Sequence, residues 1–192
     1  MRTVVYVDDY NLYYGLLRKT TLKWLDLFAL FRDHVLDPEA DLVEVRYYTA
    51  PVLGRMCDDQ ESPQRQRRYL QALRKMYPTQ ITIIEGKIIA TTPFQRLVKP
   101  IAEAPDLQMV QVYDFNEKKT DVNLAADLIA GAWTGAYEQA VCAATTRTWK
   151  LRWQRCGGII PIFVWGWLHR FLVMITAGSR PTCRGMPIGP NR

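Results

Sequence analysis

Apolar and polar positions along the chain follow two different periods, one typical of strands and one typical of helices. Residues 3–7 form a nearly continuous apolar run that ends in two aspartates, Asp8 and Asp9. Such a run predicts a parallel strand that is covered on both faces. Further apolar or alternating runs predict strands over residues 42–49, 80–89 (a strand or a hairpin), 107–113 and 138–142.

Between these strands, apolar residues recur at helical spacing. The predicted helices cover residues 12–17, 24–32, 62–77 and 117–133. In the last helix, spacing of i, i+3, i+4 and i+7 predicts a buried stripe made of Val122, Ala125, Ala126, Ile129 and Trp133. Three prolines within residues 91–105 predict a loop or flap. Strands that alternate with helices predict a three-layer α/β domain with a mostly parallel central sheet.

Two carboxylates are expected at one edge of this sheet. Asp8 ends the first strand, and Asp121 opens the helix that follows a later strand. The carboxyl ends of parallel strands share an edge, where open α/β sheets bind their ligands. In the alternative interpretation, Asp8 or Asp9 caps the following helix. Asp127 lies roughly 140° around its helix from Val122. This position is typical of a solvated acid, or of one that contacts the metal ligands and not the metal itself.

Adjacent carboxylates repel each other unless a cation lies between them. Mg²⁺ or Mn²⁺ prefers oxygen ligands, and either ion activates water for attack on a phosphoryl group. Asp8 and Asp121 are therefore the predicted metal ligands, with Asn11 as a donor to a carboxylate. The sequence contains no Ser-His-Asp or Cys-His pattern and no Gly-rich phosphate loop.

Composition and charge narrow the class of protein. A chain of 192 residues suits one domain. Its net charge of +6 comes from the tail, because all 19 acids lie at or before Glu138. Eight of the 25 Lys and Arg follow that position, which leaves 17 basic against 19 acidic groups before it. The four cysteines have neither metal-ligand nor disulfide spacing, and no signal peptide is evident, so a cytoplasmic location is expected.

Several blocks of the chain resemble bacterial NYN domains of the PIN-like nuclease superfamily. Residues 5–12 (V-Y-V-D-D-Y-N-L) are similar to the family motif V-D-G-[FY]-N-L, residues 47–50 and 66–73 also match, and residues 117–128 resemble the block K-x-x-D-V-x-L-x-x-D-L. The likeness covers about residues 3–142.

The resemblance implies a PIN-like (Rossmann-like) α/β fold and a metal-dependent ribonuclease that acts on RNA. It places the catalytic set on Asp8, Asn11, Asp121 and Asp127. Five basic residues are candidates for binding RNA, although a basic helix face is also typical of solvated surface: Arg65, Arg67, Arg68, Lys118 and Lys119.

The sequence departs from the family pattern at two places. Asp9 stands where the family has Gly, and residues 143–149 lack the acidic turn S-N-D-x-D-L. Read from the third base of codon 143, the possible codons allow S-N-D-T-D-L-E, which predicts a one-base frameshift and an aberrant tail over residues 143–192. An authentic divergent tail is the alternative, and sequencing the gene distinguishes the two.

Loss of the acidic turn predicts impaired ribonuclease activity. The alternatives are an inactive domain that binds RNA or a protein, and a product that folds badly. A homodimer is compatible with the sequence. No membrane partner is expected, because the apolar residues 159–175 are interrupted and shorter than the ~20 that a spanning helix needs.

Overall fold

The first strand, β1 (Arg2–Asp8), lies inside a six-stranded sheet in this computed structural model, which describes residues 1–57, 59–145, 162–163 and 171–177. The sheet order is β3-β2-β1-β8-β10-β9. The other strands are β2 (Asp41–Thr49), β3 (Ile81–Glu85), β8 (Gln139–Thr145), β9 (Ile162–Phe163) and β10 (Phe171–Ala177). The first four in this order are parallel, while β10 and β9 pair antiparallel.

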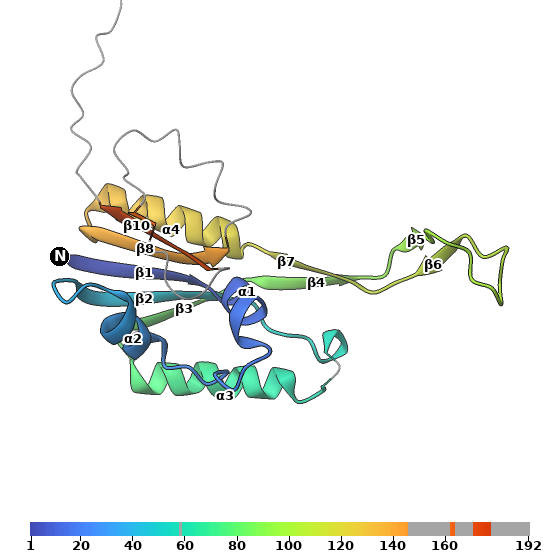
Figure 1. Ribbon diagram of the computed structural model, residues 1–192, viewed down its shortest axis with the longest axis horizontal. Coiled ribbons are helices and arrows are strands. Elements are labelled where there is room, and N and C mark those ends of the chain that lie inside the picture. Colours follow the sequence, from blue (N-terminus) through green and yellow to red (C-terminus); the bar gives the residue numbers. More distant parts are fainter. Residues whose placement is uncertain (58, 146–161, 164–170, 178–192) are drawn as a thin grey trace, which may run out of the picture.

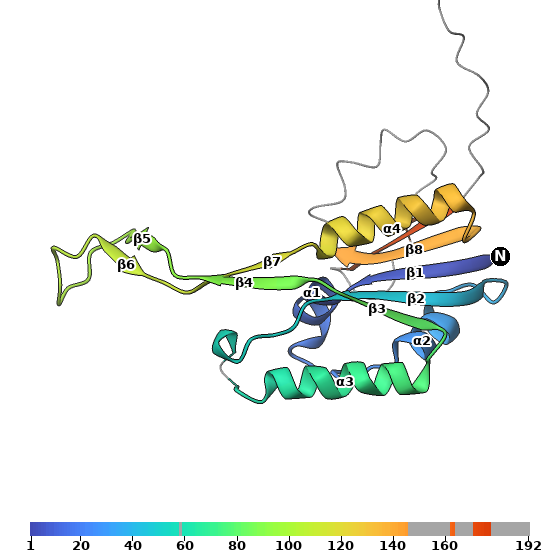
Figure 2. The same cartoon turned by 180° about the vertical axis from the view of Figure 1, so that it is seen from behind.

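Alternating side chains of β1 form two cores, one on each face of the sheet. Val5 and Val7 pack against the helices of one face, and Val4 and Tyr6 pack against the single helix of the other. The first face carries α1 (Asp9–Leu12), η1 (Tyr13–Leu17), α2 (Leu27–Leu30), η2 (Phe31–Val35) and α3 (Ser62–Met76), and the second carries α4 (Thr120–Thr134) (Figures 1 and 2). A short turn of 3-10 helix, η3 (Gly54–Met56), precedes α3.

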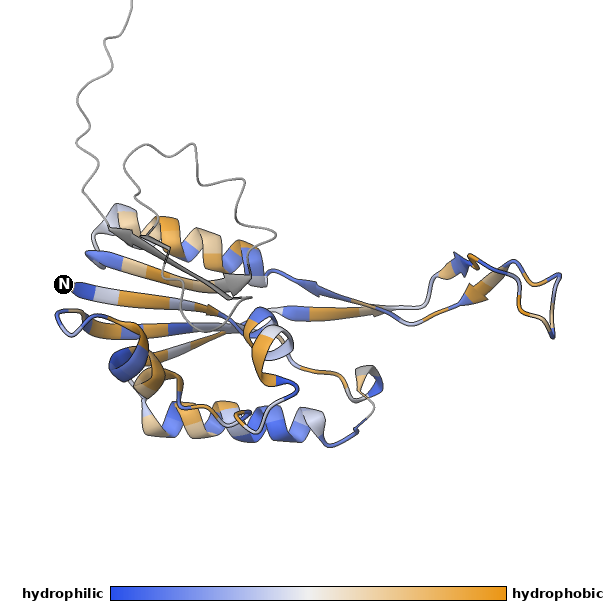
Figure 3. Cartoon of the chain, in the orientation of Figure 1, coloured by the Kyte–Doolittle hydropathy of each residue, from blue (hydrophilic) through white to orange (hydrophobic). Residues whose placement is uncertain are grey.

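These layers confirm the predicted three-layer α/β architecture, which is Rossmann-like with a parallel sheet of β3, β2, β1 and β8. Figure 3 shows that apolar residues concentrate in the sheet strands. From β1 the chain proceeds to β2 and β3 on one side and later reaches β8 on the other. The strand order therefore reverses beside β1, and ligands of such sheets bind at that point.

A long two-stranded arm replaces part of the sheet predicted from the sequence. β4 (Lys87–Thr91) pairs with β7 (Asp114–Lys118), and farther out β5 (Phe94–Arg96) pairs with β6 (Met109–Gln111). The arm projects from the carboxyl edge of the sheet (Figures 1 and 2). Two predictions are corrected: residues 80–89 are two strands in different sheets, and residues 107–113 lie outside the central sheet.

Gly86 separates β3 from β4 and explains that break. A Cβ atom there would lie 2.5 Å from the Thr120 hydroxyl and 2.8 Å from the Lys118 carbonyl oxygen. Only glycine allows the chain to pass so close to the start of α4.

The buried face of α4 also differs from the predicted stripe. Its buried residues are Thr120, Leu124, Leu128 and Gly131. Val122, Ile129 and Trp133 are instead 70%, 65% and 76% exposed. Gly131 explains why this face of α4 is the buried one. A Cβ atom at that position would lie only 2.6 Å from the Tyr137 ring, so the absence of a side chain lets the helix pack closely against the sheet. Residues 117–119, predicted as helix, belong to β7 and to the residue that precedes α4.

The tail is only partly described. Residues 143–145 complete β8, and β10 and β9 extend the sheet beyond it. The frameshift stays a prediction, since most residues on which it falls lie outside the described ranges. Within those ranges, no helix has the length and apolar character needed to cross a membrane.

Candidate functional site

Asp8 lies at the carboxyl end of β1 and caps the helix that follows. Its carboxylate accepts the backbone N–H of Asn11 at 3.0 Å and the side-chain amide of the same residue. The capping interpretation is therefore confirmed, and so is the expectation that Asn11 donates to a carboxylate. The residue is only 2% exposed, so its charge is held by these donors rather than by water.

Asp8 belongs to an acidic cluster on the α4 side of the sheet. Burial raises the pKa of Asp8, and the charges of Asp121 and Asp9 raise it further. Burial raises the pKa of Glu117 to about 7, with further contributions from Asp8 and Asp121. The charge of Asp121 acts on both Asp8 and Glu117, so the structure places Asp8 and Asp121 near each other, as the strand and helix ends predicted. Glu117 was not predicted as a member of this cluster, because the pattern of residues 117–133 predicted a helix there.

Two buried oxygens of this cluster lack a hydrogen-bond partner in the part of the chain that the structure describes. They are Glu117 Oε1 and Thr120 Oγ1. In the same part of the chain, no three His, Cys, Asp or Glu side chains form a group able to hold a metal ion. The cluster is thus rich in hard oxygen donors but is not a preformed metal site.

Asp127 lies elsewhere on α4. It is six residues after Asp121, about 9 Å farther along the helix axis. Its carboxylate accepts the Tyr48 hydroxyl at 2.8 Å and lies 3.7 Å from the Arg46 guanidinium. These contacts fasten α4 to β2, which is a structural role.

Asp9 faces the opposite side of the sheet from Asp8. Its carboxylate accepts hydrogen bonds from the Tyr47 and Thr49 hydroxyls, and the Gln66 amide beside it also favours the ionised form. Burial raises the pKa of this carboxyl in spite of these donors. Asp9 begins α1 without the positive φ that a glycine position suggests, since Lys119 is the only non-glycine residue with positive φ in the described ranges.

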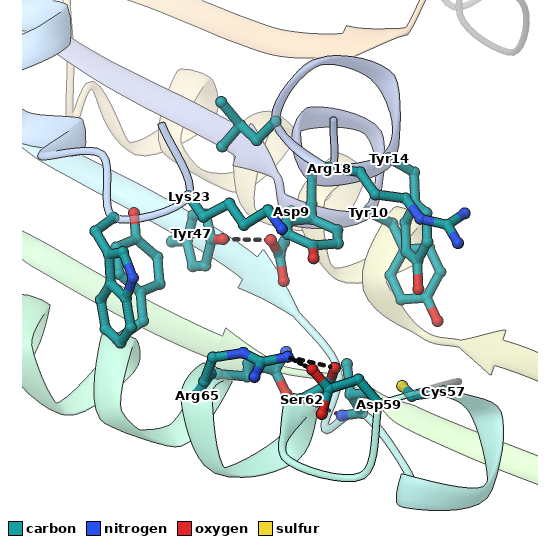
Figure 4. Close-up of a pocket in the computed structure, with 16 residues that line it drawn as sticks. Asp9, Tyr10, Tyr14, Arg18, Lys23, Tyr47, Cys57, Asp59, Ser62 and Arg65 are labelled. Carbon is teal, nitrogen blue, oxygen red and sulfur yellow. Dashed lines mark hydrogen bonds and ion pairs between the residues drawn. The ribbon is translucent and has the colours of Figure 1, made fainter. Parts of the chain in front are cut away.

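A pocket of about 320 Å³ opens above Asp9, between α1 and η1 on one side and α3 on the other (Figure 4). This volume lies near the lower end of the range for small-molecule sites. The lining is mostly aromatic and charged, and includes Tyr10, Tyr13, Tyr14, Arg18, Lys23, Trp24, Tyr47, Cys57, Asp59, Arg65, Gln66 and Tyr69.

The sequence pointed to Asp8 but not to this pocket. Asp9 looked like a substitution for glycine, and its donors Tyr47, Thr49 and Gln66 lie 38 to 57 residues away in the chain. The five tyrosines and one tryptophan that line the pocket come from separate parts of the chain, so no single stretch of sequence marked it: Tyr10, Tyr13, Tyr14, Trp24, Tyr47 and Tyr69.

The predicted basic face separates into different environments. Arg65 lines the pocket and is bound by Asp59 at 2.6 Å and by Glu61 at 3.6 Å. Arg67 and Arg68 are exposed on α3, and Lys118 and Lys119 are exposed beside the arm. The five residues therefore lie in more than one environment, and their binding of RNA stays an untested prediction.

Comparison with known proteins gives a relative of a different class. The chain is similar to the 6-hydroxy-3-succinoylpyridine 3-monooxygenase HspA of Pseudomonas putida (strain DSM 28022 / S16), with 34% identity over 160 residues. That relative is a monooxygenase. The match covers 73% of this chain and 51% of the relative, so the chain spans about half of that protein's length. No family model matches the chain, and no solved structure matches it significantly.

This match corrects the nuclease interpretation. Membership of the NYN nucleases, ribonuclease function and the inactive RNA-binding alternative all depended on short blocks around Asp8, Asn11 and residues 117–128. The longer similarity is to an oxidoreductase. Carboxylates at the carboxyl edge of a parallel sheet follow from the geometry of the fold, which supports many chemistries. An RNA partner has lost the resemblance that supported it and, like the homodimer, stays an untested prediction.

Proposed function

We propose that this chain is an oxidoreductase of the monooxygenase type, which hydroxylates a small nitrogen-containing aromatic ring. The observation that carries the proposal is the 34% identity to a pyridine monooxygenase. The pocket above Asp9 supports it, because it is an aromatic site of small-molecule size beside the strand-order reversal, where α/β sheets bind ligands.

The reaction fixes which co-reactants are needed. At ring carbon 3 of a 3-succinoylpyridine, hydroxylation replaces the bond to the acyl group. The ketone and O₂, with four electrons and four protons supplied from outside, give a ring C–OH, the side chain released as an aldehyde, and water. We assign the electrons to a reduced nicotinamide or a reduced flavin. The sequence contains no Gly-rich dinucleotide loop, so the proposal gives substrate binding to this chain and treats the reductant as a co-reactant.

A divalent ion at Asp8 and Asp121 remains a separate proposal. The unpaired oxygens of Glu117 and Thr120 and the carboxylates beside them match the preference of Mg²⁺ and Mn²⁺ for hard ligands. Such an ion would supply charge neutralisation at the cluster. A rise in melting temperature with Mg²⁺ or Mn²⁺ that is lost in Asp8→Asn tests it, and an equal rise in Asp8→Asn contradicts it. The expected cytoplasmic location also stays a proposal, consistent with the unpaired thiols of Cys57 and Cys142.

Oxygen uptake tests the main proposal. The chain is mixed with 6-hydroxy-3-succinoylpyridine, a reduced nicotinamide, a flavin and ¹⁸O₂. We expect substrate-dependent oxygen uptake and a product that carries a single ¹⁸O atom. Asp9→Asn should lose most of this activity, whereas Arg68→Gln, on the exposed side of α3, should keep it. Uptake that does not depend on substrate, or a product labelled from H₂¹⁸O, would contradict the function.

A further inference from the structure

We propose that the Asp9 pocket selects a planar aromatic acid, namely a nitrogen heterocycle that carries both a ring N–H or O–H donor and a carboxylate. The donor is bound by the carboxylate of Asp9, and the acid group is bound by Lys23, with Arg18 adding positive charge on the far side of Asp9. The inference rests on the proposed function, since it names the substrate class of the same site, but its test needs no turnover.

The base of the pocket is rigid and presents an acceptor. The Gln66 side chain accepts the Val52 N–H at 2.9 Å and donates to the Thr49 hydroxyl at 3.1 Å and the Ala50 carbonyl at 3.0 Å. Gln66, Thr49 and Tyr47 in turn hold Asp9. A carboxylate has about four lone-pair sites, and the Tyr47 and Thr49 hydroxyls occupy two of them, which leaves acceptor capacity for a ligand.

The walls favour a flat ligand. On one side the rings of Tyr10 and Tyr14 lie 5.0 Å apart at 34°. On the other, Tyr69 contacts Trp24 and Tyr47 edge to face, with ring centroids 6.2 and 6.4 Å apart. Rings that brace one another cannot turn aside without losing these contacts, so they form fixed surfaces for stacking. The volume of about 320 Å³ suits one or two fused rings with a short side chain.

The charges favour an acid. Arg65 is already bound by Asp59, and these two lie together on one side of the pocket (Figure 4). Lys23 and Arg18 lie on the other side with Asp9 between them in that view. Lys23 makes no salt bridge within the described residues, although its charge helps to lower the pKa of Asp59. The Arg18 guanidinium lies 5.5 Å from the centroid of the Tyr14 ring.

The two cations therefore exceed the charge of Asp9 by one when that carboxyl is ionised. A ligand with one negative charge at the end opposite its ring donor balances the pocket. A neutral heterocycle leaves the positive charge uncompensated, and a dianion adds a charge that no further cation in the pocket matches.

Isothermal titration calorimetry on the full chain, without reductant, tests this selection. The probes are 6-hydroxynicotinate, its neutral amide, and benzoate, which lacks a ring donor. We expect 6-hydroxynicotinate to bind at least about tenfold more tightly than either of the others, the size of one lost charged or hydrogen-bonded contact. Lys23→Gln should weaken the acid by about tenfold and the amide by less than twofold, while its matched control Lys75→Gln, exposed on α3, leaves both unchanged.

Asp9→Asn should abolish the preference for 6-hydroxynicotinate over benzoate. The variant should also be less stable, since Asn offers the Tyr47 and Thr49 hydroxyls one acceptor oxygen in place of two, so the titration is run well below its melting temperature. The inference is overturned if the three probes bind equally, if Lys23→Gln and Lys75→Gln behave alike, or if a reduced nicotinamide or flavin binds in the pocket and 6-hydroxynicotinate does not displace it. Binding without oxygen uptake would refute the proposed function and keep this site. Oxygen uptake that is insensitive to Lys23→Gln and Asp9→Asn would refute this site alone.

Discussion

Asp8 and Asp9 are adjacent in the chain but belong to different environments. Asp8 faces α4, where the charge of Asp121 raises its pKa and its own charge raises the pKa of Glu117. Asp9 faces α3 and is held by hydroxyl and amide donors under an aromatic pocket with cations at its rim. Successive side chains of β1 point to opposite faces of the sheet, and this alternation continues through Asp8 and Asp9. The carboxyl edge of the sheet therefore has two different sites, an acidic cluster on one face and an aromatic pocket on the other.

The same division occurs on the neighbouring strand. The Tyr47 hydroxyl donates to Asp9 on the pocket side, and the Tyr48 hydroxyl donates to Asp127 on the α4 side. Each side of the sheet therefore has one carboxylate tied to one tyrosine of β2. On the acidic side, the carboxylates repel one another unless a proton or a cation is bound. On the pocket side, the Asp9 carboxylate is already stabilised by the hydroxyls of Tyr47 and Thr49.

The largest effect is expected from closing the gap beside the acidic cluster. In Gly86→Ala the new methyl group would meet the Thr120 hydroxyl at 2.5 Å and the Lys118 carbonyl at 2.8 Å. We expect a loss of about 2 kcal/mol in unfolding free energy, since one contact atom is backbone. Urea denaturation measures it. Gly54→Ala is the control, because nothing lies within 4 Å of its position, and an equal loss there would refute the argument.

Removing one hydroxyl from each side compares the two environments directly. Tyr47→Phe takes a donor from nearly buried Asp9 and should cost about 1–2 kcal/mol at neutral pH. Tyr48→Phe should cost about 0.5–1 kcal/mol, because the Asp127 side chain is 38% exposed and water replaces the donor. Denaturation of both variants at the same pH provides the measurement. A larger loss for Tyr48→Phe would reverse the proposed difference between the two sides.

Local patterns predicted the sheet well. The apolar run before Asp8, the alternation over residues 42–49 and the strand from residue 138 fixed three parallel strands. The face of α4 could not be chosen in the same way, because the helix is apolar on two sides. Tyr6 and Tyr137, distant in sequence, decide which side is buried by their fit against Gly131.

The site was predicted only in part, for a related reason. Asp8 and Asp121 follow from strand and helix ends, which a sequence shows. Asp9 depends on three donors from β2 and α3, and Glu117 depends on an arm that the apolar pattern assigned to the sheet and a helix. The neighbours of Asp9 and Glu117 come from distant parts of the chain, so no local sequence pattern identifies these two residues as members of a site.

Glu117 gives a pH test of the acidic side. Its pKa in the folded chain is about 7, against an ordinary value of 4.5. The folded state therefore keeps a proton that the unfolded chain has released, so stability falls as pH rises through this window and levels off above it. Glu117→Gln should be about 1 kcal/mol more stable than the parent at about pH 8, after allowance for solvent screening, and equal to it at low pH. Melting curves across this range measure the slope, and an unchanged slope would show that Glu117 ionises normally.

The smallest effect on the domain is expected from removing the tip of the arm. Within the arm, β4 pairs with β7 and β5 pairs with β6, and neither pair joins the central sheet. Phe94, Val98 and Tyr113 are 65%, 97% and 64% exposed. Replacing residues 92–113 by a short Gly-Ser turn should shift the melting temperature by less than about 2 °C and leave binding of 6-hydroxynicotinate unchanged. Calorimetry and titration measure both.

Gel filtration of the same variant addresses the homodimer. An isolated two-stranded ribbon is marginally stable in water. Burial of the exposed apolar side chains of the arm against a second copy would therefore stabilise it. If two copies associate through their arms, the parent elutes as a dimer and the variant as a monomer, with the pocket unchanged in both. A variant that remains dimeric places the contact elsewhere, for example on the exposed face of α4 with Val122, Ile129 and Trp133. If the variant instead loses ligand binding, the arm contributes to the Asp9 pocket. The pocket and the acidic cluster would then both depend on the arm.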